Sequence, residues 1–158
     1  MDTNYFVGFY ESRKLAWESK VKQLTSLEPH IKQMKQRDVK SFNQEFRTIH
    51  LDFGRRTGNT TFIMNKCFEL AIIGKKSCFC FFINLHMAER FWQLMEVLSG
   101  TKIYRGSSNI FVNTFGQMKH SWQHIPNSYA FVDVSCMMGA KQLDQIMGSD
   151  QWEIISLL

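Results

Sequence analysis

One stretch of the sequence decides the fold, and it reads Phe53-Gly54-Arg55-Arg56-Thr57-Gly58-Asn59-Thr60-Thr61. The apolar run Thr48–Leu51 precedes it, and an apolar helical pattern from Phe62 to Ile73 follows it. A strand, a glycine-containing loop and a helix in this order are typical of a phosphate-binding loop. Glycines let backbone N–H groups face an anion, and the helix N-terminus adds a partial positive charge. The hydroxyl groups of Thr60 and Thr61 stand where a Mg²⁺ ligand is expected.

The same stretch also permits a purely structural interpretation. A Gly-x-x-x-Gly turn followed by two threonines is compatible with a tight connection between a strand and a helix, with Thr60 as the helix cap. The stretch also differs from the usual phosphate-binding pattern, because Asn59 stands where a lysine normally follows the second glycine. An asparagine amide donates hydrogen bonds but carries no charge. Phosphate binding and phosphate transfer are therefore separate predictions.

The chain after Arg47 alternates between short apolar runs and helical patterns. Strands are predicted at residues 48–53, 77–84, 109–114, 129–133 and 152–158. Helices are predicted between them, at residues 60–73, 87–98 and 140–147. Residues 77–84 are apolar on both faces, as in a central parallel strand. This alternation predicts an α/β fold with a mainly parallel sheet and flanking helices.

The first 46 residues are predicted to be helical and to precede the first strand. Apolar side chains recur there every three or four residues, at Phe6, Tyr10, Trp17, Val21 and Leu24. Pro29 is expected to end this helix and to begin a second, weaker helical segment. We predict a single domain, in which an N-terminal helical segment (residues 1–46) packs on an α/β core (residues 47–158).

Composition and charge limit the classes of protein and partner. The chain has 158 residues, of which 44% are hydrophobic, which is enough to bury a core. No apolar run approaches the roughly 20 residues needed to cross a bilayer, so no membrane partner is expected. The net charge of +5 is compatible with a polyanionic partner, although acidic residues are interspersed among the basic ones. The first residues lack a basic n-region, so a secretory signal is not expected.

The four cysteines are expected to be small buried hydrophobic residues in a reducing cytosol. They show neither a CxxC pair nor a matched Cys/His spacing, which argues against zinc. Cys78 and Cys80 are two residues apart in a predicted strand, so their side chains are expected on the same face.

Two further strands carry polar side chains near their carboxyl ends. The apolar run Tyr129–Val132 leads directly into Asp133, and the last strand carries Ser156. Because ligands of open α/β sheets bind outside the carboxyl ends of the strands, Asp133 is expected near the glycine-containing loop. The alternatives are that Asp133 is a turn or cap residue and that Ser156 is an ordinary strand serine.

In the order of these motifs, the chain resembles P-loop ATPases of the helicase type and of the terminase large subunits that package viral DNA. That group uses a loop of the form small-Arg-x-x-Gly-Lys-Thr-Thr, and residues 54–61 match it at every position except the lysine. Tyr129–Asp133 resembles the Mg²⁺-associated motif, and Ile154-Ile155-Ser156 resembles the sensor strand that couples hydrolysis to movement. The resemblance covers residues 47–158.

The resemblance implies that ATP and Mg²⁺ bind at one site. Thr60 and Asp133 would hold the metal, and Ser156 would act as the sensor. Arg55 and Arg56 would contact phosphate and, with Asp133, take part in catalysis. The remaining cofactor-binding positions would be Gly54, Thr57, Gly58, Asn59 and Thr61.

The resemblance also implies a location and partners. The location is the cytoplasm, which for a viral protein is that of the host. The partners are nucleic acid, with DNA the first choice, or a larger viral protein assembly.

Two departures from the family pattern weaken the prediction of hydrolysis. Asn59 replaces the lysine that neutralises the phosphates, and Val134 stands where a glutamate would orient the attacking water. Asp144 and Glu153 are the acids that would have to approach the site to replace that glutamate. Phosphoryl transfer depends on positioning and charge stabilisation, so losing both groups would disable it.

We therefore expect a nucleotide-binding protein whose ATPase activity is weak or lost. The alternative is a non-enzymatic module that keeps the fold and binds nucleic acid or protein. A third interpretation is a structural subunit of a larger particle.

Overall fold

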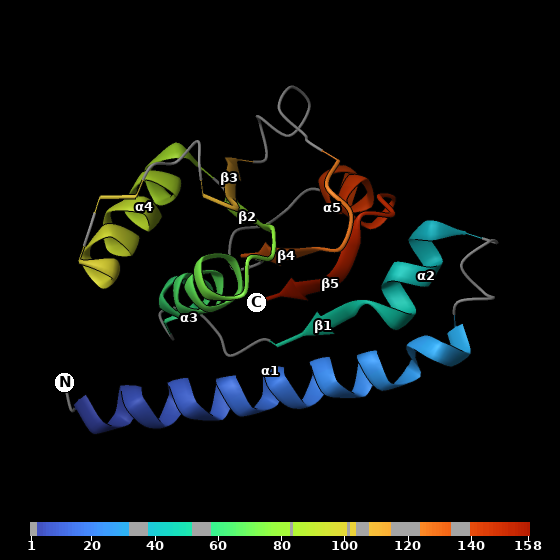
Figure 1. The fold of residues 1–158 in the computed structure, drawn as a ribbon, viewed down its shortest axis with the longest axis horizontal. Helices are drawn as coiled ribbons and strands as arrows, with labels where there is room; N and C mark the ends of the chain where they lie inside the picture. The colour runs from blue at the N-terminus through green and yellow to red at the C-terminus, as the bar shows by residue number, and fades with distance from the viewer. Residues whose placement is uncertain are drawn as a thin grey trace.

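The computed structural model describes residues 3–31, 38–51, 58–82, 84–100, 102–103, 108–114, 124–133 and 140–158 (Figure 1). Its helices are α1 (Thr3–Ile31), α2 (Val39–Phe46), α3 (Asn59–Cys67), the π-helix η1 (Phe68–Ile73), α4 (Leu85–Ser99) and α5 (Ala140–Met147). Its strands are β1 (Thr48–His50), β2 (Cys78–Phe82), β3 (Ile110–Thr114), β4 (Ser128–Val132) and β5 (Trp152–Leu157). None of the helices in these segments is long and apolar enough to cross a membrane.

The five strands form one parallel sheet in the order β1-β5-β4-β2-β3. This confirms the predicted α/β fold with a parallel sheet, flanking helices and a preceding helical segment. Every residue of β2 and of β4 is buried, as expected for central parallel strands that are covered on both faces. The short strand β1 lies at one edge of the sheet, and α1 runs beside it (Figure 1).

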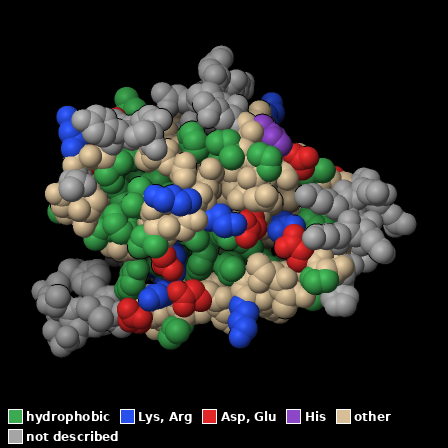
Figure 2. Space-filling model, in the orientation of Figure 1, with side chains coloured by type: hydrophobic (Ala, Val, Ile, Leu, Met, Phe, Trp, Pro, Cys, Tyr) green, Lys and Arg blue, Asp and Glu red, His purple; other side chains and the backbone are tan. Residues whose placement is uncertain are grey.

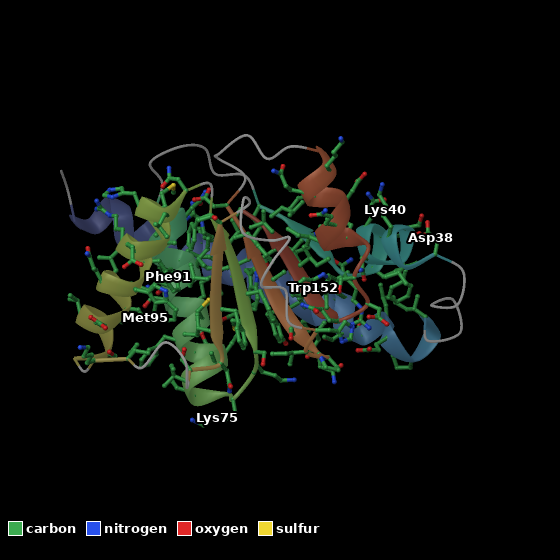
Figure 3. All side chains as sticks on the ribbon, turned by 90° about the horizontal axis from the view of Figure 1, so that it is seen from above. Asp38, Lys40, Lys75, Phe91, Met95 and Trp152 are labelled. Carbon is green, nitrogen blue, oxygen red and sulfur yellow. The ribbon has the colours of Figure 1, made fainter. Side chains whose placement is uncertain are left out.

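Helices cover both faces of the sheet. Seen from above, α3 and α4 lie on one side, where Phe91 and Met95 of α4 are buried against the sheet, and α5 and α2 lie on the other (Figure 3). On the α5 side, Trp152 packs with Phe79 and Ile146 in a second apolar cluster. Alternate residues of β2 supply these two clusters, because side chains of a strand point to opposite faces in turn.

Trp17 anchors α1 to the sheet. Its indole Nε1–H donates a hydrogen bond of 2.8 Å to the hydroxyl oxygen of Ser156, which is buried in β5. The indole stacks on Phe131 of β4 at 6.2 Å between ring centroids and meets Phe62 of α3 edge-on at 6.5 Å. A buried indole N–H needs a hydrogen-bond partner, so this bond allows the large side chain to be buried without leaving its N–H unsatisfied.

A buried cation joins α1 to α3 beside this indole. The ammonium group of Lys66, only 1% exposed, lies 2.9 Å from a carboxylate oxygen of Glu18 and 2.9 Å from one of Glu69. It also lies 5.0 Å from the centroid of the Trp17 ring, within the range of a cation–π interaction. Burial lowers the pKa of Lys66, but the hydrogen bonds and charges of the two carboxylates outweigh burial, so the pKa is raised and the lysine stays charged.

Some predicted boundaries were wrong. The first helix continues through Pro29 to Ile31. Pro29 lies in the last turn, so its missing N–H removes only one helical hydrogen bond. Helix α4 begins at Leu85 instead of residue 87, because Asn84 Oδ1 accepts a hydrogen bond of 3.0 Å from the Met87 N–H and caps the helix.

Ion pairs and hydrogen bonds hold the amino edge of the sheet together. Arg47 joins α1 to β5, because its guanidinium contacts Glu28 at 2.7 Å and donates to the Glu153 carbonyl oxygen at 3.0 Å. The Glu153 carboxylate accepts hydrogen bonds from Lys76, at 3.0 Å, and from the Tyr129 hydroxyl, at 2.9 Å. These contacts satisfy the polar groups where β4 and β5 begin.

Replacing Trp17 by alanine tests the anchoring of α1. Trp17→Ala removes a buried aromatic side chain and leaves the Ser156 hydroxyl without its donor, so the free energy of unfolding should fall by about 3–5 kcal/mol. Leu15→Ala, at a position of the same helix that is 65% exposed, should change it by less than about 0.5 kcal/mol. Urea denaturation measures both values. Equal losses in the two variants would show that the indole does not anchor the helix.

Replacing Tyr129 by phenylalanine tests the contact between Tyr129 and Glu153 at the amino edge through the pH dependence of stability. Burial, together with the charge and hydrogen bond of Glu153, raises the pKa of Tyr129 above its ordinary value of 10.0. The folded protein therefore holds this proton more tightly than the unfolded chain does. The resulting contribution to stability is complete below pH 10.0 and declines as the pH rises toward the folded-state pKa, by at most about 1.4 kcal/mol per pH unit. Urea midpoints measured from pH 8 upward should fall less steeply above pH 10.0 in Tyr129→Phe than in the wild type. The same pH dependence in both proteins would contradict a raised pKa of Tyr129.

Candidate functional site

The three strands that carried the sequence motifs are neighbours in the sheet. Strand β5 lies between β1 and β4, and one row across them joins Ile49, Ser156 and Phe131. Since all three strands are parallel, the start of the loop after β1 and Asp133 after β4 lie at the same carboxyl edge, one strand apart. This is the edge at which ligands of open α/β sheets bind.

Helix α3 begins at this edge with a glycine as its N-cap. Gly58 has a φ of +81° in the left-handed region, and among the described residues no side chain caps the helix. The Thr60 cap considered from the sequence was therefore wrong, because Thr60 is already inside the helix. The first helical hydrogen bond joins the Phe62 N–H to the Gly58 oxygen at 2.9 Å. The N–H groups of the residues before Phe62 precede the helical bonding pattern, and they carry the positive end of the helix dipole.

Part of the predicted loop lies outside the described residues. This applies to Gly54, Arg55, Arg56 and Thr57, and also to Val134 after β4. The positions from Gly58 to Thr61 are described, and they form the N-cap and first turn of α3.

Asn59 occupies the first position of α3, where the sequence pattern normally has lysine. Its side-chain oxygen Oδ1 is shielded from solvent and accepts no hydrogen bond from any group that the structure describes. A buried acceptor without a donor costs about 1–3 kcal/mol, so an N–H or O–H group of a ligand that donates to it would be stabilised there.

Asp133 directly follows β4 and is 2% exposed. Its backbone N–H donates to the Phe81 oxygen at 3.2 Å, which extends the pairing of β4 with β2 to the end of the strand. This bond fixes the backbone of Asp133 at the carboxyl edge. A buried carboxylate in such a place is the residue type that holds Mg²⁺ beside phosphate in α/β proteins.

The predicted sensor residue Ser156 lies on the face of β5 that α1 covers. Its hydroxyl oxygen accepts the hydrogen bond from Trp17, so its first observed role is structural. The sequence offered no signal for this contact, because the two residues are 139 positions apart.

The next lysine of α3 does not replace the one missing at position 59. Lys66 lies seven residues further along, about 10 Å along the helix axis. Its ammonium group is held by Glu18 and Glu69 against Trp17. A positive charge supplied by α3 itself is therefore directed toward α1 and away from the start of the helix.

Neither acid considered as a substitute for the missing glutamate reaches the carboxyl edge. Glu153 stands at the amino end of β5, at the opposite edge from Asp133, where it binds Lys76 and Tyr129. Asp144 lies on α5 and pairs with Lys40 of α2 at 2.9 Å. Both carboxylates are already engaged in contacts between secondary-structure elements.

The site has few charged ligands for a metal. In the described segments no group of three or more His, Cys, Asp or Glu side chains is arranged to hold a metal ion. A Mg²⁺ ion beside Thr60 and Asp133 would therefore depend on oxygen atoms of the nucleotide and of water for most of its ligands, as is usual for this ion.

A comparison with models of known protein families found no match, and comparisons with curated proteins and with solved structures found none either.

Proposed function

We propose that the protein binds a nucleotide, with ATP and Mg²⁺ as the first choice, at the carboxyl edge of β1 and β4, and that it hydrolyses the nucleotide weakly or not at all. On this proposal, the protein is P-loop-like and related to helicase and viral DNA-packaging ATPases. The observation that carries the proposal is the start of α3 at Gly58, which no described side chain caps, at the sheet edge where the buried carboxylate of Asp133 also lies.

The start of α3 supports the binding of a phosphate group. A glycine in the left-handed region turns the chain into the helix without a side chain over the first turn. Apart from its chain neighbours, no described residue has an atom within 4 Å of a Cβ added at Gly58, which supports room for a ligand there. Backbone N–H groups and the helix dipole attract an anion at such a position.

The balance of charge supports binding better than hydrolysis. Asn59 is neutral, Lys66 is neutralised by two carboxylates, and Glu153 stands at the other edge of the sheet. Transfer of a phosphoryl group requires positive charge at the phosphates and a group that positions the attacking water. Among the described residues, the carboxyl edge supplies Asp133 for the metal but neither of these two groups.

The same observation favours a second candidate, a binding module that keeps the fold without the chemistry. Its partner would be a protein or a nucleic acid. On the face seen in Figure 2, the described Lys and Arg side chains are interspersed with Asp and Glu, so this face carries no single-sign basic patch. A contact that depends on a few specific groups fits this face better than a broad electrostatic one.

The variant Asn59→Lys tests the proposed nucleotide site. Restoring the cation should strengthen binding of Mg²⁺-ATP about tenfold to a hundredfold, the gain expected from a charge-assisted hydrogen bond. Titration calorimetry measures the affinity, and release of inorganic phosphate measures turnover. Asp133→Asn should remove the Mg²⁺ dependence of binding, provided that circular dichroism shows an intact fold.

The matched control is Asn65→Lys, which adds the same charge to the same helix. Asn65 lies six residues beyond Asn59, about 9 Å along the axis, and its amide donates to the Thr61 oxygen. An equal gain in both lysine variants would indicate nonspecific attraction and would contradict the site. Binding by the wild-type protein with little or no turnover is the result expected of the proposal, whereas no binding by either the wild type or Asn59→Lys would exclude it and favour the second candidate.

The variant Gly58→Ala tests whether the turn at Gly58 is part of the nucleotide site. A left-handed φ disfavours alanine, so the variant should lose about 1 kcal/mol of stability and also bind nucleotide more weakly, because relief of the strain moves the first turn of α3. Gly100→Ala is the control, since Gly100 has a φ of +66° and equally open surroundings at the end of α4. It should lose similar stability in urea denaturation but keep the wild-type affinity. Equal affinities in the two variants would show that the turn at Gly58 is not part of the site.

A further inference from the structure

Three thiol groups meet in the core between α3 and β2. Cys67 ends α3, while Cys78 and Cys80 lie two residues apart on β2, and all three are completely buried. The sulfur atoms of Cys67 and Cys80 are 3.2 Å apart. Cys78 is close enough to contribute to the raised pKa of the Cys67 thiol, after burial as the main cause. The proposed nucleotide site uses none of these groups.

The geometry of a strand restricts which of these thiols can be joined. Cys78 and Cys80 point to the same face, and their Cα atoms are about 6.6 Å apart because a parallel strand rises about 3.3 Å per residue. Their Cβ atoms point in the same direction, so they remain far outside the roughly 3.5–4.5 Å that a disulfide requires. Any disulfide within the cluster must therefore include Cys67.

Cys80 is the better placed partner of Cys67. The 3.2 Å between their sulfur atoms is about 1.2 Å longer than a disulfide bond, so small rotations of the two side chains would close it. We propose that Cys67 and Cys80 form a reversible disulfide that links the end of α3 to β2. The oxidant would be a low-molecular-weight disulfide such as oxidised glutathione.

The reaction consists of two thiol–disulfide exchanges. The Cys67 thiolate attacks one sulfur of the oxidised glutathione, which forms a mixed disulfide and releases one glutathione thiolate. The Cys80 thiolate then attacks the Cys67 sulfur, which closes the protein disulfide and releases the second glutathione thiolate. The two protein thiols lose two protons and two electrons, and the glutathione disulfide is reduced to two thiols.

Burial determines when this reaction takes place. It raises the pKa of the Cys67 thiol and that of the Cys80 thiol, so few thiolates exist while the core is closed. The exchange is therefore expected while the chain folds or while the end of α3 opens. Once it has formed, the disulfide is buried as well, so its reduction also requires the end of α3 to open. The disulfide closes a loop that contains η1 and the turn into β2.

Refolding in a redox buffer tests the proposal. The full-length chain, with Cys136 replaced by alanine to leave only these three thiols, is unfolded in denaturant and refolded in reduced and oxidised glutathione. Free thiols are then alkylated, and peptide mapping by mass spectrometry identifies the pairs. The Cys67–Cys80 pair should exceed Cys67–Cys78 by about tenfold or more, because strain disfavours the other pairs. The thermal midpoint of the oxidised protein should be higher than that of the reduced protein.

Two variants serve as controls in the same background. Cys78→Ala should keep the cross-link and the rise of the midpoint, whereas Cys80→Ala should lose both. Mapping of the background protein itself needs neither variant, so a failure of one of them to fold leaves the test decisive. Complete alkylation of all three thiols, or equal amounts of the two pairs that contain Cys67, would overturn the proposal.

Discussion

The hydrogen bond between the Trp17 indole and the Ser156 hydroxyl is the contact on which the architecture depends. It lies in an apolar layer, where an unpaired N–H would be costly, and it joins the first helix to the last strand. Around it, α1 meets β4 through Phe131 and α3 through Phe62 and Lys66. The helix that precedes the core thus becomes part of it and covers the edge strand β1, whose backbone would otherwise be open to pairing.

The two edges of the sheet differ in how far their polar groups are satisfied. At the amino edge, Arg47, Lys76, Tyr129 and Glu153 satisfy one another across α1, β4 and β5. At the carboxyl edge, no described side chain caps the first turn of α3, and the side-chain oxygen of Asn59 has no donor among the described groups. The contacts of the amino edge therefore contribute mainly to stability, and the carboxyl edge is where we propose that the nucleotide binds.

Much of this fold could be predicted from the sequence, because the apolar runs of β2 and β4 have the length and the burial of central parallel strands. The glycine at position 58 and Asp133 after β4 could also be placed at strand or helix ends from local pattern alone. The order of the strands and the docking of α1 could not, since the contact of Trp17 with Ser156 joins residues 139 positions apart and follows no local periodicity. Asn84 is of a residue type that commonly caps helices, so the start of α4 at Leu85 could also be predicted from the sequence.

The π-helix between Cys67 and Gly74 limits the insertions and deletions that this segment of the chain can accept. Its wider turns hold one more residue per hydrogen-bonded ring than an α-helix does, as the bond from the Gly74 N–H to the Glu69 oxygen shows. Each residue of an α-helix turns the chain by about 100°, so deleting one residue here would restore ordinary helical bonds and rotate the entry into β2. Cys80 would then no longer face Cys67. Insertions and deletions should be rarer in this segment than substitutions, even though Ile73 at its end is exposed to solvent.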